Sequence, residues 1–284
     1  MIYHYTNIDT LRLILESGKI RFNNLNAVDD ELESDLFVKK SLAQLIFVSC
    51  WTTDPNENIP LWKMYASTRG VRIGLPDYPW RKIDCKKWKK EEMEVRYDPK
   101  AEYFSPFEID EIFGKRHFII PPFSLPTSDK NFKKAFSKEV VYLTDEELKA
   151  KYSGHYSEKL TKPGHAELTI NPIDFGLYKH ERWAFQKEFR FVLFICPIVD
   201  SNKLPNKIMH ESINHALMKY IQADWKSPLK DFFVRLDPIS KENMEITLGP
   251  HCTEEDARLV SALIQKHGIV RVLKKSGVRM RENS

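Results

Sequence analysis

Residues 183–194 read Trp-Ala-Phe-Gln-Lys-Glu-Phe-Arg-Phe-Val-Leu-Phe, and this stretch decides the fold of the chain. Its first half is polar with interspersed aromatic residues, and its second half consists of residues that favour β-strands. Glu188 and Arg190 share one alternation phase at the start of the strand, after which both phases are apolar. Such a pattern is typical of a central strand that is covered on both faces.

Glu188 stands where this strand enters the predicted core. Burial and neighbouring charges shift the pKa of a carboxyl group, so a carboxylate at this position is a candidate for catalysis. Arg190 lies two residues further along the same face and could pair with Glu188 or bind a phosphate through two parallel hydrogen bonds. The alternative interpretation is an exposed cluster of charges at the start of a strand.

The composition is that of a globular protein. The chain has 284 residues, of which 42% are hydrophobic and 30% charged, with a formal net charge of +4. This charge permits an acidic partner such as a nucleotide or nucleic acid without requiring one. The cysteines form no Cys-x-x-Cys pair, which indicates reduced thiols in a cytoplasmic protein without a structural zinc site. We expect neither a signal peptide nor a membrane-spanning segment.

Short strands outnumber helices along the chain. Strands are predicted at 2–6, 20–22, 45–51, 71–75, 94–97, 232–236 and 244–250, and helices after Asn7 and at 61–67, 145–151, 206–221 and 254–267. Strands and helices rarely alternate strictly, which predicts an α+β fold with a mixed, mostly antiparallel β core and flanking helices. We expect one domain over 1–284, with an irregular insertion around 98–180, most irregular over 152–173. Segments 2–6, 45–51, 71–75 and 189–196 should share the core, with helix 254–267 against it.

The helix ends carry recognisable signals. Asn7 can cap the first helix by accepting hydrogen bonds from free backbone amides, and Gly18 suits the left-handed residue that ends it. Thr253 and Asp256 form the pattern of a capping box at the start of the last helix.

Aromatic residues near the middle of the chain have two interpretations. Trp62 and Tyr65 are three residues apart and therefore share a helix face. They could form a wall for a planar ring such as a base or nicotinamide, or they could pack in the core. His4, alone on a short strand, is likewise either a ligand-binding residue or a core histidine with its hydrogen bonds satisfied.

Three segments together resemble a widespread uncharacterised bacterial family. They are Tyr3-His4-Tyr5-Thr6 with the helix ending at Gly18, the Leu61–Ala66 segment with residues 69–74, and Trp183 with Glu188-Phe189-Arg190. The pieces 248–250 and 276–278 fit the same pattern, so the resemblance spans nearly the whole chain. Gln186 departs from it, since that family usually has Glu at this position.

More remotely, the order of these segments is similar to ADP-ribosyltransferases, in particular the DNA-targeting toxins. The resemblance implies an ADP-ribosyltransferase-like fold with a cleft for NAD⁺, which is the substrate, and no metal. It implies an enzyme of the toxin or phage-defence kind that modifies nucleic acid or protein. The implied catalytic residues are Glu188 and His4, and the implied cofactor-binding residues are Tyr3, Tyr5, Thr6, Trp62, Tyr65, Arg69 and Arg190.

Two other classes remain open. One is a metal-dependent nuclease-like effector that uses the acidic loop Asp29, Asp30, Glu31 and Glu33. The other is a non-catalytic nucleotide- or protein-binding module with Trp62, Tyr65 and Arg72 on its surface. The transferase requires Glu188, His4 and Tyr65 to converge on one cleft, the nuclease requires the loop carboxylates to converge, and the module requires neither.

Overall fold

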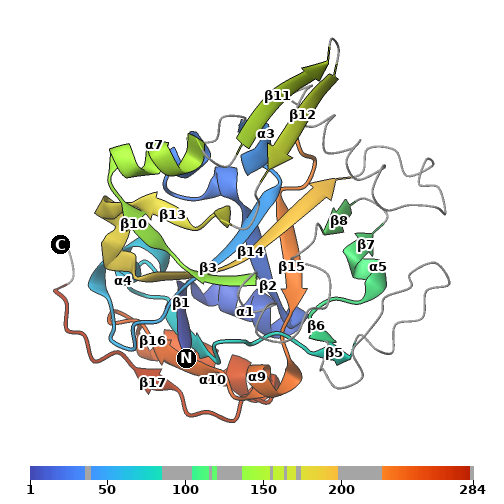
Figure 1. The fold of residues 1–284 in the computed structure, drawn as a ribbon. Coiled ribbons are helices and arrows are strands. Elements are labelled where there is room, and N and C mark those ends of the chain that lie inside the picture. Colours follow the sequence, from blue (N-terminus) through green and yellow to red (C-terminus); the bar gives the residue numbers. More distant parts are fainter. Residues whose placement is uncertain are drawn as a thin grey trace, which may run out of the picture.

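A computed structural model describes residues 1–35, 40–84, 104–114, 117–119, 136–153, 156–162, 165–170, 174–197 and 226–281. Within these residues the chain is an α+β fold built on a mostly antiparallel 11-stranded sheet (Figure 1). The strands of this sheet are β1 (Ile2–Thr6), β2 (Lys19–Asn24), β3 (Ile46–Thr52), β4 (Val71–Leu75), β7 (Phe113–Gly114), β8 (His117–Ile119), β9 (Ser137–Glu139), β14 (Glu188–Pro197), β15 (Asp231–Arg235), β16 (Glu245–Leu248) and β17 (Lys274–Lys275).

The main path of the sheet runs β17-β16-β4-β1-β3-β14-β8-β7, with β2, β9 and β15 attached beside it. Two-stranded sheets add β5 (Ile83–Asp84) with β6 (Phe104–Ser105), β10 (Val141–Leu143) with β13 (Tyr178–His180), and β11 (Tyr156–Lys162) with β12 (His165–Ile170). The helices are α1 (Ile8–Ser17), α2 (Leu32–Asp35), α3 (Lys40–Ala43), α4 (Ile59–Tyr65), α5 (Ile109–Ile112), α7 (Asp145–Ser153), α9 (Pro238–Glu242) and α10 (Glu254–Lys266), with 3₁₀ turns η1 (Leu25–Ala27) and η4 (Glu181–Gln186).

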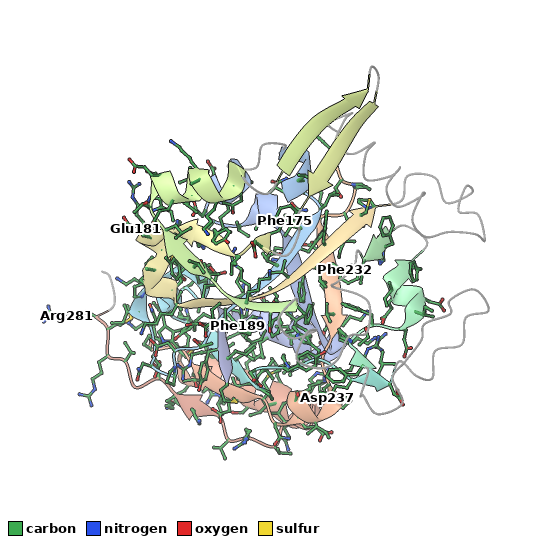
Figure 2. All side chains as sticks on the ribbon, in the orientation of Figure 1. Phe175, Glu181, Phe189, Phe232, Asp237 and Arg281 are labelled. Atoms are coloured by element: carbon green, nitrogen blue, oxygen red, sulfur yellow. The ribbon has the colours of Figure 1, made fainter. Side chains whose placement is uncertain are left out.

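β14, the predicted central strand, lies in the middle of the sheet. β14 begins at Glu188 and pairs with β3 from Glu188↔Thr52 to Phe194↔Ile46, while β9 and β8 pair with its other edge. Phe191 and Leu193 are fully buried within the core. In Figure 2 the labelled Phe189 lies near the middle of the molecule, whereas Arg281 projects at its margin. The predicted central strand, and the common sheet for the four predicted segments, are confirmed.

The predicted helix signals are also confirmed. The Asn7 side chain accepts a hydrogen bond from the backbone of Thr10 at 2.7 Å, and Gly18 ends α1 with a left-handed φ of 63°. Thr253 and Asp256 exchange the hydrogen bonds of a capping box at the start of α10. This helix adds Val260 to the main core and lies at the same end of the molecule as α9 (Figure 1).

The turn after α4 is held very close to β1. Ser67 and Thr68 adopt positive φ values of 48° and 58°. Gly70, two residues further on, packs against the end of β1 at Thr6. A Cβ atom on Gly70 would lie 2.1 Å from the carbonyl oxygen of Thr6, so a side chain there requires the backbone to move. This contact fixes how α4 sits against β1.

Some predictions differ from the structure or fall outside it. Residues 152–173 were expected to be irregular, but β11 and β12 form an antiparallel hairpin that projects from the body (Figure 1). Polar, charged and small residues dominate both strands, so their sequences lack the alternation of polar and apolar residues by which a strand is recognised. The strand predicted at 94–97 and the helix predicted at 206–221 lie outside the described residues. Among the helices that the structure describes, none combines the length and hydrophobicity needed to cross a membrane.

Replacement of Leu193 tests the central position of β14. Leu193 is 0% exposed, so Leu193→Ala should lower the free energy of unfolding by about 2–5 kcal/mol through lost burial and an unfilled cavity. Urea denaturation followed by circular dichroism measures this change. Leu13→Ala on α1, where the side chain is exposed, is the control and should change it by about 0.5 kcal/mol or less. Equal losses would contradict the assignment.

Candidate functional site

A pocket lies where β1 and β3 separate. In the described part of the chain these strands share one register pair, Tyr3↔Thr52, whereas β1 pairs with β4 from Ile2↔Leu75 to Thr6↔Val71. The pocket has a free volume of about 160 Å³. The residues that line it come from five regions of the chain and are Tyr3, His4, Tyr5, Arg21, Asn23, Ala27, Val28, Asp29, Val48, Ser49, Cys50, Trp51, Thr52, Leu61, Tyr65, Lys179, Gln186, Glu188 and Arg190.

Arg190 is fully buried beside the pocket and uses all its donors. Its Nε donates to Glu188 Oε1 at 2.6 Å and its Nη2 donates to Glu188 Oε2 at 3.0 Å. The remaining N–H groups donate to both carboxylate oxygens of Glu33 and to the carbonyl oxygen of Gly176. A guanidinium has five N–H donors, and here each has an acceptor. Arg190 was predicted to bind the cofactor, but in this arrangement it has no donor left for a phosphate.

Lys179 completes an ionic cluster with Glu33, Glu188 and Arg190. Its Nζ donates to Glu188 Oε2 at 3.2 Å and to Gln186 Oε1 at 2.8 Å, and it lies 3.5 Å from a Glu33 oxygen. Two carboxylates thus face two cations, which satisfies the requirement that buried charges be paired. Glu188 is 6% exposed and Arg190 0% exposed, so the interpretation of an exposed charge cluster is wrong.

The ionic cluster fixes the protonation state of Glu188. Burial alone would raise the pKa of this carboxyl group, but the positive charges of Arg190 and Lys179 outweigh burial and lower the pKa to about 2. Glu188 is therefore a carboxylate at neutral pH. Beside it on β3, burial raises the pKa of the Cys50 thiol and the Glu188 charge raises it further, so this thiol stays protonated.

His4 presents a hydrogen-bond acceptor in the pocket wall. Its Nδ1 lies 2.9 Å from the carbonyl oxygen of Cys50, which can only accept, so Nδ1 carries the proton. Burial lowers the pKa of His4 below its ordinary value, which keeps the ring neutral at neutral pH. Its Nε2 is then unprotonated, and it makes no hydrogen bond within the described residues.

Tyr65 connects the rim of the pocket to the ionic cluster. Its hydroxyl donates to Asp29 Oδ2 at 2.5 Å and accepts from Gln186 Nε2 at 2.8 Å. Burial, followed by the neighbouring Asp29 carboxylate, raises the pKa of Tyr65, so the hydroxyl is neutral. A chain of hydrogen bonds thus runs from Asp29 through Tyr65 and Gln186 to Lys179.

Three residues predicted for the site lie outside the pocket lining. Trp62 is 0% exposed, packs edge-on against Tyr5 at 4.9 Å and donates to Glu57, so it belongs to a small core and not to a wall with Tyr65. Arg69 pairs with Asp256 at 2.9 Å at the start of α10. Thr6 is buried near the contact with the turn after α4.

The orientation of α4 explains why Trp62 is buried whereas Tyr65 lines the pocket. Sequence spacing places Trp62 and Tyr65 on one broad face of the helix, but the close packing of α4 on β1 buries the first of them. Tyr65, in the last turn, remains at the edge of the helix where the pocket lies.

Tyr3 and Tyr5 do line the pocket, as predicted. The Arg72 guanidinium stacks over the Tyr3 ring at 4.4 Å, and the Tyr5 hydroxyl accepts a hydrogen bond from the backbone of Asn58 at 3.0 Å. Both side chains are therefore held in place by neighbouring residues.

The acidic loop does not gather its carboxylates. Asp29 faces Tyr65, Asp30 accepts from the backbone of Leu32, and Glu33 faces Arg190. Within the described residues no group of three His, Cys, Asp or Glu side chains could hold a metal ion. The convergence that the nuclease interpretation requires is absent from the described loop.

Lys179 and Arg21 were not among the residues predicted for the site, and Glu33 was a candidate only as a metal ligand. Glu33 is 157 positions from Arg190 in sequence, so no local pattern relates the two. The alternation of polar and apolar residues on β2 was the available signal for Arg21, because it places Arg21 on the face opposite the buried Ile20 and Phe22.

Comparisons of the chain with models of known protein families, with curated proteins and with solved structures found no match.

Acid titration tests the ionic cluster. Because the pKa of Glu188 is lowered from 4.5 to about 2 on folding, its stabilising contribution is complete above pH 4.5 and is lost as the pH falls towards 2. This shift corresponds to about 3 kcal/mol. Urea unfolding between pH 7 and pH 2 should show a steeper loss of stability in the wild type than in Glu188→Gln. Glu146→Gln, at an exposed site on α7, should behave like the wild type; an identical profile in all three proteins would refute the assignment.

Proposed function

We propose that the pocket binds NAD⁺ and cleaves its nicotinamide glycosidic bond, and that the fold is ADP-ribosyltransferase-like. The observation that carries the proposal is the convergence of Glu188, His4 and Tyr65, from three separate elements, on one pocket. The first step is common to ADP-ribosyl transfer, in which a nucleic acid or protein acceptor attacks the ribose, and to hydrolysis, in which water attacks it. Such consumption of NAD⁺ would suit a toxin or phage-defence effector.

Glu188 supplies the electrostatic requirement of this reaction. As nicotinamide leaves, positive charge develops on the ribose in an oxocarbenium-like transition state. A carboxylate that is already ionised and held in place stabilises this charge without reorganisation. The pKa of about 2 and the hydrogen bonds from Arg190 keep Glu188 in that state. The carboxylate can also accept a hydrogen bond from a ribose hydroxyl.

His4 and Tyr65 would orient the nicotinamide riboside portion. The unprotonated Nε2 of His4 is an acceptor suited to a ribose hydroxyl, which is a donor. The Tyr65 ring offers a flat apolar face for nicotinamide, and its hydroxyl is fixed by Asp29 and Gln186. Restricting the substrate in this way lowers the entropic part of the barrier.

A non-catalytic nucleotide-binding module is the second candidate. It is favoured by one observation: both oxygens of Glu188 already accept hydrogen bonds from Arg190, and the ionic cluster is balanced without a ligand. The two functions differ in whether NAD⁺ is consumed.

The first experiment compares two carboxylates of the same ionic cluster. Protein is incubated with NAD⁺ labelled in the nicotinamide ring, with and without single-stranded DNA, and free nicotinamide is measured. Glu188→Gln should lower the rate by about 10²-fold or more, because an electrostatic stabiliser lowers the barrier by a few kcal/mol.

Glu33→Gln is the matched control. Both substitutions leave Arg190 with one carboxylate fewer, and each should destabilise the protein by about 3–5 kcal/mol. Glu33 does not line the pocket, so its variant should lose much less activity. Rates are compared at a temperature where circular dichroism shows both variants folded. Parallel losses of rate would make Glu188 a structural residue, and binding of NAD⁺ without release of nicotinamide would favour the non-catalytic module.

A second experiment separates Tyr65 from Trp62. Trp62 is 0% exposed and Tyr65 36% exposed, so Trp62→Ala should lower the free energy of unfolding by about 3–5 kcal/mol and Tyr65→Ala by much less. Tyr65→Ala should instead raise the Kd for NAD⁺ by about 10-fold, the effect expected when a stacked aromatic ring is lost. Calorimetric titration and thermal unfolding measure the two effects. If Tyr65→Ala changed stability and affinity in the proportion seen for Trp62→Ala, Tyr65 would not be part of the binding site.

A further inference from the structure

We infer that Arg21 and Asn23 on β2 form the subsite that holds the phosphate groups of a ribosyl phosphate ligand, and this inference rests on the proposed function of the same pocket. The relevant chemistry is a dianionic diphosphate attached to the ribose that Glu188 and His4 face. Neither residue was a candidate from the sequence, and Arg69 and Arg190, which were, are engaged elsewhere.

Among the described residues, Arg21, Lys179 and Arg190 are the cations that line the pocket, and the last two are paired with carboxylates. Arg190 uses all five N–H donors on Glu188, Glu33 and the backbone of Gly176. Lys179 faces two carboxylates and Gln186, and its ammonium lies 4.7 Å from the centre of the Trp183 ring. Both charges are thus neutralised by buried carboxylates and have little attraction left for a second anion.

Within the part of the chain that the structure describes, Arg21 is the pocket-lining cation whose donors have no hydrogen-bond acceptor. Its side chain is 59% exposed, and the ion pair that it makes with Asp231 is long at 3.8 Å. It makes no hydrogen bond within the described residues. A guanidinium with a free planar fork binds phosphate oxygens through two parallel hydrogen bonds, which makes arginine the side chain best suited to this group.

The geometry of β2 places Asn23 beside it. Arg21 and Asn23 alternate with the buried Ile20, Phe22 and Asn24, so both point to the pocket side of the strand. The Asn23 amide also makes no hydrogen bond within the described residues and adds two N–H donors. Arg21 and His4 line the same pocket, and the charge of Arg21 adds to the effect of burial in lowering the pKa of His4.

The position of this pair suits a charged part of the ligand. The inner pocket is small and contains the buried Glu188, so a second set of negative charges is disfavoured there by repulsion. The exposed Arg21 lies where the pocket meets solvent, so a diphosphate can keep part of its hydration while it binds. The adenosine portion of NAD⁺ would then lie outside the pocket, and the nicotinamide riboside portion inside it.

Calorimetric titration with ADP-ribose, in phosphate-free buffer, tests the inference. ADP-ribose has the ribosyl diphosphate but no nicotinamide bond to cleave, so its binding is measured independently of turnover. Arg21→Gln should raise its Kd by about 10- to 100-fold, as expected for loss of a charged hydrogen-bond donor. Arg21→Lys, which keeps the charge without the fork, should give an intermediate value. Raising the salt concentration should weaken binding in the wild type more than in Arg21→Gln.

Arg235→Gln is the matched control, because it removes an exposed arginine from the neighbouring strand β15 outside the pocket. It should change the Kd by less than about twofold. Glu188→Gln should still bind ADP-ribose, so a protein that binds it through Arg21 without cleaving NAD⁺ would retain this inference and lose the proposed reaction. Equal affinity of the wild type and Arg21→Gln, or no binding of ADP-ribose by the wild type, would overturn it. The inference would also be overturned if Arg21→Gln bound a single-stranded DNA oligonucleotide more weakly than the wild type but bound ADP-ribose with unchanged affinity.

Discussion

A single buried guanidinium organises the centre of this protein. Arg190 lies on the central strand of the sheet without exposure to solvent, and a charge in that position is tolerated only when its donors are satisfied. Its acceptors come from α2, from the segment before β13 and from the start of β14. The polar contact therefore determines where these elements meet, because moving any one of them would leave part of the charge unpaired. The pocket is formed next to this contact.

The same requirement links stability to the chemistry of the site. The carboxylate of Glu188, which is proposed to act on the substrate, is also one of the two carboxylates that neutralise Arg190. The same carboxylate accepts a hydrogen bond from Lys179. Its low pKa follows from this neutralisation and not from contact with water. A site built in this way maintains a fixed charge at the pocket over the whole physiological pH range, while the neutral His4 opposite adds an acceptor without adding charge.

Local patterns in the sequence predicted the fold well. The run of apolar residues after Glu188 identified the central strand, and the capping residues Asn7 and Thr253 identified the starts of two helices. These features depend on neighbours within a few positions. The β11–β12 hairpin was missed because its polar and charged residues obscure the alternation of a strand. The residues 94–97 and 206–221, predicted to be regular, lie outside the described part of the chain.

The candidate site could be predicted only in part. Glu188, His4, Tyr65, Tyr3, Tyr5 and Arg190 do line one pocket, whereas Trp62, Arg69 and Thr6 do not. Helical spacing showed that Trp62 and Tyr65 share a face, but which part of that face is covered depends on packing against β1. The partners of Arg190 and the availability of Arg21 depend on contacts between distant segments, and a single sequence has no periodicity that reports them. The ADP-ribosyltransferase-like assignment stays a proposal.

The close approach of Gly70 to Thr6 has a consequence for the evolution of this pocket. It limits how far β1, which carries His4, can lie from the segment that follows α4, which carries Tyr65, although Gly70 is not among the described residues that line the pocket. A methyl group added at Gly70 would push the segment after α4 away from β1. The pocket side chains would then keep their chemical identity but change their positions relative to one another. Descendants of this chain are therefore constrained at a position that an inventory of pocket residues omits. A side chain at Gly70 would therefore disturb the pocket without changing any of its described lining residues.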